Sequence, residues 1–195
     1  MTNGLYALKP WYARRLEPVV ASLEQRGVTA NQVSIAGIAF AAAAGAVVAC
    51  VPSGPVTALV VAGLLAARLA CANMDGTLAR RRPRDLAGGL TNELGDRAAD
   101  LAMLACFVPH LGWPAFVILL AATLPSWAAL AAAAQGGARS NAGPVGKTER
   151  CVLVVLAAGT GWFAGAGVAI AIGSVFTVAV RLAAGRRQLR TGAHR

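Results

Sequence analysis

Long apolar stretches separated by short polar segments dominate this chain, and they constrain its fold more than any other feature. An α-helix needs about 20 mostly apolar residues to cross a bilayer. The sequence predicts six such helices, at 31–51, 55–82, 91–111 and 114–135 and as a hairpin over 147–187 that turns within the glycine-rich segment 159–167. A single helix over the uncharged segment 151–180 would be about 45 Å long, which exceeds a hydrocarbon core of about 30 Å and favours the hairpin.

The composition indicates a membrane protein rather than a soluble domain. Hydrophobic residues make up 57% of the 195 residues and charged residues only 13%, and the mean hydropathy is positive. The four cysteines form no C-x-x-C pair, so we interpret them as small apolar side chains rather than disulfides or zinc ligands. The predicted fold class is therefore all-α, a polytopic membrane protein with six transmembrane helices.

Lysines and arginines occur on alternate connections between the predicted helices. They cluster before the first helix, after the second, between the fourth and fifth, and at the C-terminus, whereas the connections near residues 52, 112 and 161 contain none. Six spans place every basic cluster on one side, which the positive-inside rule makes cytoplasmic. We therefore expect a multi-pass protein of the cytoplasmic (inner) membrane with both termini inside. The net charge of +10 does not indicate nucleic acid as a partner, because these residues flank membrane helices and attract anionic lipid headgroups.

The N-terminal segment differs from the rest of the chain. It has no apolar core long enough for a signal peptide, and its spacing of apolar and basic residues predicts an amphipathic segment lying in the cytoplasmic interface. Its apolar residues are Leu5, Leu8, Trp11, Tyr12, Leu16 and Val19. Pro10 and Pro18 are expected to break it into pieces. The expected organisation is a juxtamembrane segment at 1–30, a six-helix domain at 31–187 and a basic cytoplasmic tail at 188–195.

Three aspartates lie inside otherwise apolar stretches, namely Asp75, Asp96 and Asp100. A carboxylate is costly to bury in a membrane helix, so such residues point to a functional site. Asp96 and Asp100 are four residues apart and share a helix face, and Glu93 lies one turn before Asp96 on roughly the same side. Asp75 is followed by Gly76, which allows a ligand to approach the backbone closely. These residues predict a site near the cytoplasmic ends of the second and third helices.

The same residues resemble the signature of the CDP-alcohol phosphotransferase (CDP-alcohol phosphatidyltransferase) family. That signature reads D-x-x-D-G-x-x-A-R, then a spacer and G-x-x-x-D-x-x-x-D. The segment from Asp75 to Arg80 matches the first block from its second Asp onward, and Asp96 with Asp100 matches the closing D-x-x-x-D. The chain departs from the signature twice, since Ala72 stands at the first Asp and Asn92 at the glycine of the second block.

The resemblance implies a reaction and a set of ligands. The hydroxyl of an acceptor alcohol would attack the β-phosphorus of a CDP-alcohol such as CDP-diacylglycerol, and CMP would leave. Two divalent ions, Mg²⁺ or Mn²⁺, would be held by Asp75, Asp96 and Asp100, with Glu93 as a candidate replacement for the aspartate missing at 72; hard oxygen ligands suit both metals. Asp100 would also act as the general base. The resemblance further implies a homodimer.

Other positions of the resemblance concern the donor and the acceptor. Asn31 and Ser34 match an N-x-x-S/T element that contacts the CDP-lipid, although Thr29 or Asn31 could equally cap the first membrane helix. The remaining residues expected to bind the donor are Gly76, Ala79, Arg80 and Asn92, with Arg80 paired to a phosphate. Lys147 and Arg150 would bind a phosphorylated acceptor. The alternative interpretation of that loop is an inside-positive connection without a ligand.

Two other classes of function stay open. Ala72 removes one expected carboxylate, which is compatible with a catalytically impaired relative that has a structural or scaffold role and releases no CMP. Intramembrane carboxylates also occur in small transporters, although inverted repeats and helices broken near the midplane would favour transport, and the acidic residues here lie near one surface. For the enzyme, Asp100→Asn is expected to abolish turnover and to leave folding largely intact.

Overall fold

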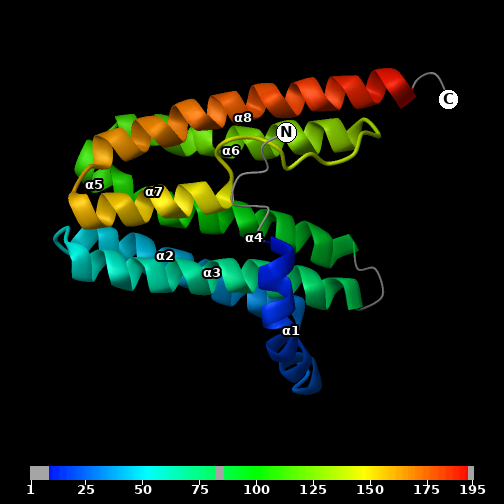
Figure 1. Ribbon diagram of the computed structural model, residues 1–195, viewed down its shortest axis with the longest axis horizontal. Helices are drawn as coiled ribbons and strands as arrows, with labels where there is room; N and C mark the ends of the chain where they lie inside the picture. The colour runs from blue at the N-terminus through cyan, green and yellow to red at the C-terminus, as the bar shows by residue number, and fades with distance from the viewer. Residues whose placement is uncertain (1–8, 82–85, 193–195) are drawn as a thin grey trace.

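The computed structural model describes residues 9–81 and 86–192, and all regular structure in that part of the chain is helical (Figure 1). The helices are α1 (Lys9–Gln25), α2 (Ala30–Cys50), α3 (Pro55–Arg81), α4 (Leu86–Leu104), the 3₁₀ turn η2 (Ala105–Phe107), α5 (Val108–Leu111), α6 (Pro114–Ala134), α7 (Lys147–Thr160) and α8 (Phe163–Gly192). The predicted all-α class is therefore confirmed.

Helices α2, α3, α4, α6, α7 and α8 run side by side in layers, and α1 lies across α3 (Figure 1). Helix α2 packs against α3 and α4, and α6 packs against α8. Helix α7 contacts both α3 and α8, while α4 contacts both α2 and α6, so α4 and α7 join the two outer pairs. The connections near 52, 112 and 161 lie at one end of the bundle, opposite α1 and the C-terminal end of α8 (Figure 1).

Four helices are long and apolar enough to cross a membrane, namely α2, α3, α6 and α8. Helix α4 carries charged residues on its inner turns, and α7 has only 14 residues, although both run along the bundle. The chain is thus a polytopic membrane protein, and the count of six spans stays a prediction. The predicted hairpin over 147–187 is present, because α7 ends at Thr160, Gly161 caps it with a positive φ of 73°, and α8 begins at Phe163.

The third predicted helix, 91–111, begins earlier and is not continuous. It starts at Leu86, and the α-helix ends at Leu104, before the 3₁₀ turn and the short α5. Pro109 explains the interruption, because proline cannot donate a hydrogen bond to the carbonyl four residues before it, which is that of Ala105, and its ring crowds the same carbonyl. The break lies at the end of the bundle away from α1 (Figure 1).

Helix α1 corrects the prediction that its prolines would break the N-terminal segment. It is one helix from Lys9 to Gln25 with Pro18 inside it. Pro10 lies in the first turn, where the missing N–H would have no partner within the helix. Arg81, at the end of α3, pairs with Glu17 before Pro18 and with Glu24 after it, so α1 is held on both sides of the proline.

Some parts of the predicted terminal segments lie outside the described residues. These are Leu5 and Leu8, the side chains of Trp11 and Tyr12, and residues 193–195. Helix α8 itself continues to Gly192, so residues 188–192 of the expected tail belong to that helix. The division into 1–30, 31–187 and 188–195 stays a prediction.

Close packing of α2 on its neighbours sets the position of the site. Thr29 caps this helix through a capping box with Gln32. A Cβ at Gly45 would lie 2.6 Å from the carbonyl oxygen of Ala102 on α4, and one at Gly37 would lie 3.1 Å from Cβ of Cys71 on α3. The contact at Gly45 requires glycine, since a side chain would push the helices apart, and the contact at Gly37 is close. The inner faces of α2, α3 and α4 therefore approach closely around the residues described next.

Candidate active site

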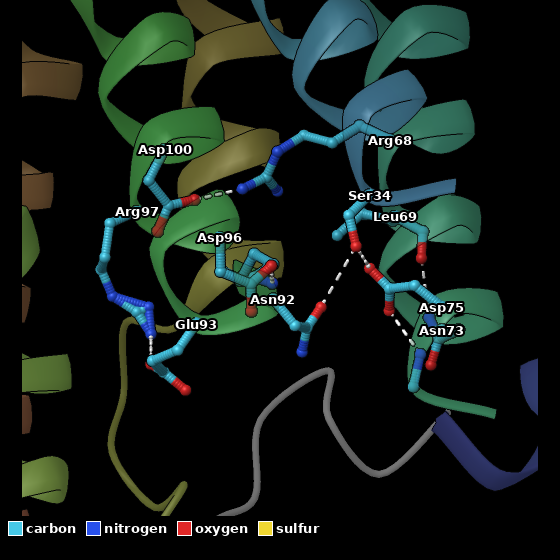
Figure 2. Close-up of polar contacts among 12 residues, drawn as sticks. Ser34, Arg68, Leu69, Asn73, Asp75, Asn92, Glu93, Asp96, Arg97 and Asp100 are labelled. Atoms are coloured by element: carbon cyan, nitrogen blue, oxygen red, sulfur yellow. Dashed lines mark hydrogen bonds and ion pairs between the residues drawn. The ribbon is translucent and has the colours of Figure 1, made fainter. Parts of the chain in front are cut away.

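A small polar cavity lies among α2, α3 and α4, toward the end of the bundle that carries α1 (Figure 2). Its lining residues are Ser34, Gly37, Arg68, Ala72, Asp75, Gly95, Asp96 and Ala99. The first two come from α2, the next three from α3 and the last three from α4. Two of the three predicted aspartates thus face one cavity, and the alanine that replaces the first aspartate of the signature faces it as well.

Asp75 is buried and is held from both sides. The hydroxyl of Ser34 donates to its Oδ2 at 2.8 Å, and the backbone N–H of Gly76 donates to its Oδ1 at 2.5 Å. The same Ser34 hydroxyl lies 3.3 Å from Oδ1 of Asn92 on α4. Figure 2 shows these three side chains converging from α2, α3 and α4. Ser34 and Asn92, both predicted to contact the donor, are therefore at the cavity.

Asp96 faces the more open side of the cavity. Lys147, the first residue of α7, donates to its Oδ1 at 2.5 Å. Each of these two side chains is 26% exposed, so the pair is reached by solvent or by a ligand from the end of the bundle. The predicted acceptor-binding lysine is thus in direct contact with a predicted metal ligand.

Asp100 lies one turn deeper than Asp96 and is 5% exposed. Its Oδ1 accepts a hydrogen bond from Arg68 on α3, and its Oδ2 accepts one from Nη2 of Arg150 on α7 at 2.5 Å. Arg68 is 1% exposed and Arg150 is 4% exposed. One carboxylate therefore joins α3, α4 and α7 through two buried ion pairs, and neither of its oxygens is free in this arrangement.

Arg68 is the site residue that the sequence prediction missed. It lies four residues before Ala72 and seven before Asp75, so these three positions share one face of α3. An arginine inside a predicted membrane helix is as unusual as an aspartate, so the cost of burying its charge also marks Arg68 as a functional residue. Its Nε, like the Nε of Arg150, has no hydrogen-bond partner among the described residues.

Glu93 does not lie with the three aspartates. It pairs with Arg97 on the next turn of α4 and with Nη1 of Arg139 at 2.5 Å, which attaches the 135–146 connection to that helix. Among residues 9–81 and 86–192, no group of three or more His, Cys, Asp or Glu side chains is placed to hold a metal ion. The predicted four-residue ligand set is thus gathered only in part, with Asp75 and Asp96 at the cavity.

The remaining predicted positions lie outside the cavity lining, near the start of α2 and the end of α3. Asn31 is exposed one turn before Ser34, and Ala79 and Arg80 are exposed near the end of α3. The guanidinium of Arg80 is close to its own helix, 3.1 Å from Oγ1 of Thr77. The amide of Asn73 donates to the carbonyl of Leu69 (Figure 2), so it does not take the place of the missing aspartate at 72.

Comparison with known proteins gives relatives in sequence and in structure. No protein-family model matches the chain. The inner membrane protein YnbA of Escherichia coli (strain K12) is 31% identical over 153 residues, which is 76% of each chain. A crystal structure of Mycobacterium tuberculosis phosphatidylinositol phosphate synthase in complex with manganese and citrate superposes with a TM-score of 0.67 and 20% identity, covering 86% of this chain and 87% of that one.

A second structure of the same synthase, with CDP-DAG bound, gives a TM-score of 0.69 with 21% identity and covers 88% of this chain and 94% of that one. At this level of identity the likeness concerns the fold. The predicted resemblance to the CDP-alcohol phosphatidyltransferases is therefore confirmed by the fold, which places the D-G-x-x-A-R and D-x-x-x-D segments of this chain on two adjacent helices at the polar cavity.

Proposed function

Because the chain belongs to the family of the inner membrane protein YnbA and has the fold of the CDP-alcohol phosphatidyltransferases, we propose that it transfers a phosphatidyl-type group from a CDP-alcohol to an acceptor hydroxyl. The bond from the acceptor oxygen to the β-phosphorus forms, the bond from that phosphorus to CMP breaks, and CMP leaves. The observation that carries the proposal is the convergence of Asp75 on α3 and Asp96 on α4 at one polar cavity between membrane helices.

The donor would be a CDP-lipid such as CDP-diacylglycerol, whose acyl chains stay in the membrane while the nucleotide lies at the end of the bundle. The bound CDP-DAG in the structurally similar synthase supports this donor class. Ser34 lines the cavity and Asn92 lies within 3.3 Å of its hydroxyl, and both would contact the donor together with the exposed Asn31 and Ala79 and the partly buried Gly76. Arg80 would bind a phosphate oxygen at the end of α3, where its side chain is exposed.

A divalent cation, Mg²⁺ or Mn²⁺, would be held by Asp75 and Asp96. The donor set fits such an ion, because both residues supply carboxylate oxygens to the same cavity. When bound, the ion would neutralise charge on the diphosphate and polarise a phosphoryl oxygen. Asp100 does not offer a free oxygen in this arrangement, since Arg68 and Arg150 occupy both.

Asp100 is the proposed general base, and the basic residues of α7 control its availability. Its Oδ2 accepts from Arg150, so it takes up the hydroxyl proton only after that pair opens. A phosphorylated acceptor would provide the competing anion, because phosphate forms charge-assisted hydrogen bonds with both Arg150 and Lys147. Binding of such an acceptor would thus release the carboxylates that these residues cover in its absence.

The direct test is release of CMP from CDP-diacylglycerol by the purified protein with Mg²⁺ or Mn²⁺. The acceptor panel contains glycerol phosphate, inositol phosphate, inositol and serine. Metal-dependent release with one acceptor, lost in Asp96→Asn, is the expected result. Asp96 suits this test because its ion pair is partly exposed and contributes little to folding. Absence of release with every acceptor would favour a scaffold role for this relative.

We further propose that the protein lies in an inner membrane as a homodimer with the site toward the cytoplasm. The name of the sequence relative supports the membrane. The grouping of the site, α1 and the C-terminal end of α8 at one end of the bundle supports the orientation (Figure 1). Transport is not favoured, because α2, α3, α6 and α8 are continuous helices within the described residues.

A further inference from the structure

The arginine at position 68 contributes a positive charge to the lining of the cavity. Ala72 and Arg68 are one turn apart on α3, and both line the cavity together with Asp75. In the family signature, position 72 would carry an aspartate, which is a metal ligand. This chain has removed that carboxylate and has a buried guanidinium one turn away, bound to Asp100 on the opposite helix.

The charges of the site are balanced without any metal ion. Its carboxylates are Asp75, Asp96 and Asp100, and its cations are Arg68, Lys147 and Arg150, so that the net charge is zero. A site with aspartate at 72 and an uncharged residue at 68 would be more negative by two charges. That difference equals the charge of one divalent cation. In a low-dielectric interior such a difference decides how many cations the site holds, because uncompensated buried charge is strongly unfavourable.

Arg68 also has an unused hydrogen-bond donor. Its Nη2 donates to Asp100 and its Nη1 lies 3.6 Å from Sγ of Cys151, whereas its Nε has no partner among the described residues. A planar guanidinium with a buried and unused donor is suited to an anion such as a phosphate oxygen. The position, the charge and the unused donor of Arg68 are therefore all suited to binding an anion.

We propose that Arg68 takes the place of one of the two divalent cations implied by the signature. The site then holds a single divalent cation, between Asp75 and Asp96. The guanidinium of Arg68 provides the remaining positive charge, permanently and without exchange, beside Asp100 and the diphosphate of the donor. This inference rests on the proposed phosphatidyl transfer, and it makes Arg68 a determinant of metal stoichiometry that the signature does not contain.

The test counts bound Mn²⁺ per chain, using the electron paramagnetic resonance signal of free Mn²⁺ during titration of the purified protein in nanodiscs with CDP-diacylglycerol. The wild-type protein is expected to bind one ion. The variant Arg68→Ala/Ala72→Asp restores the two negative charges and is expected to bind two. Its matched control, Arg68→Ala/Ala72→Asn, has the same side-chain size at 72 without the carboxylate and is expected to bind one.

Two ions in the wild-type protein, or none, would overturn the proposal, and so would a single ion in the Arg68→Ala/Ala72→Asp variant. If that variant does not fold, Ala72→Asp alone provides the test. Arg68 remains to neutralise the new carboxylate there, so one ion is expected, and two would refute the role of Arg68. These counts need no turnover. Failure of the proposed function would instead appear as absence of CMP release by the wild-type protein with every acceptor, whatever the ion count.

Discussion

Replacing Asp100 with asparagine removes the one negative charge that Arg68 and Arg150 share. The sequence alone predicted that this change would leave folding largely intact. In the structure both arginines are buried, at 1% and 4% exposure, and each uses one oxygen of Asp100. The substitution therefore leaves two guanidinium groups without a counter-charge among α3, α4 and α7.

The expected loss in the free energy of unfolding of Asp100→Asn follows from the burial of these ion pairs. Removing one partner of a buried ion pair destabilises a protein by about 3–5 kcal/mol, because the other charge remains buried and uncompensated. Asparagine is close in size to aspartate and its Oδ1 still accepts one hydrogen bond, which places Asp100→Asn near the lower end, at about 3 kcal/mol. Asp96→Asn is the matched control. Its pair with Lys147 is 26% exposed on both sides, and exposed pairs contribute only about 0–1 kcal/mol.

The assay is reversible unfolding of the purified protein by SDS in mixed micelles, followed by circular dichroism, with the free energy of unfolding compared among the variants. Asp100→Asn should lose at least about 2 kcal/mol more than Asp96→Asn, the difference between the two magnitudes above. Equal losses in the two variants would refute the argument that the Asp100 pairs are buried and structural. In that case the loss of turnover in Asp100→Asn would be attributed to chemistry alone.

Three further predictions concern the donor, the acceptor and the helix packing. Arg80→Ala should weaken binding of CDP-diacylglycerol by roughly 10- to 100-fold, since a charge-assisted hydrogen bond contributes about 1.5–3 kcal/mol; an unchanged Kd would reject its phosphate contact. Lys147→Met should raise KM by roughly 10- to 100-fold for a phosphorylated acceptor, for the same reason, and should not raise KM for an uncharged one. Gly45→Ala should destabilise the fold by about 1–3 kcal/mol, because its Cβ would lie 2.6 Å from the carbonyl of Ala102. In contrast, Gly63→Ala should not destabilise the fold, because its Cβ meets nothing within 4 Å. Equal effects of the two substitutions would contradict the close contact of α2 with α4.

The membrane helices were predictable because their signals are local. Apolar length predicted α2, α3 and α6 to within one residue and the α7–α8 hairpin from its first residue, although α8 continues to Gly192 instead of ending at 187. Helix α1 was predicted wrongly because the helix around Pro18 is held by Arg81, which is distant in sequence. The C-terminal end of α4 differs from the predicted one for a local reason, namely the proline at 109.

The residues of the site could be predicted from the sequence, but the ion pairs among them could not. Asp75, Asp96 and Asp100 follow from the cost of a carboxylate in an apolar helix, and two of them do line one cavity. The pairs Asp96–Lys147 and Asp100–Arg150 join positions 51 and 50 residues apart. No local pattern determines such contacts, since they depend on how α7 packs beside α4.

The ion pairs also bear on the choice between an enzyme and a scaffold. Buried ion pairs are a poor means of stabilising a helical bundle, because replacing them with apolar residues of similar size is often neutral or stabilising. A scaffold made from this fold would gain as much from leucines at positions 68, 100 and 150. The same groups do have a use in binding a diphosphate, since Arg68 and Arg150 each keep an unpaired Nε in the buried cluster, and Asp75 and Asp96 offer oxygens to a cation. Ligand binding would explain the physical cost of the cluster where stability does not, which supports the proposed phosphatidyl transfer over a scaffold role despite the alanine at position 72.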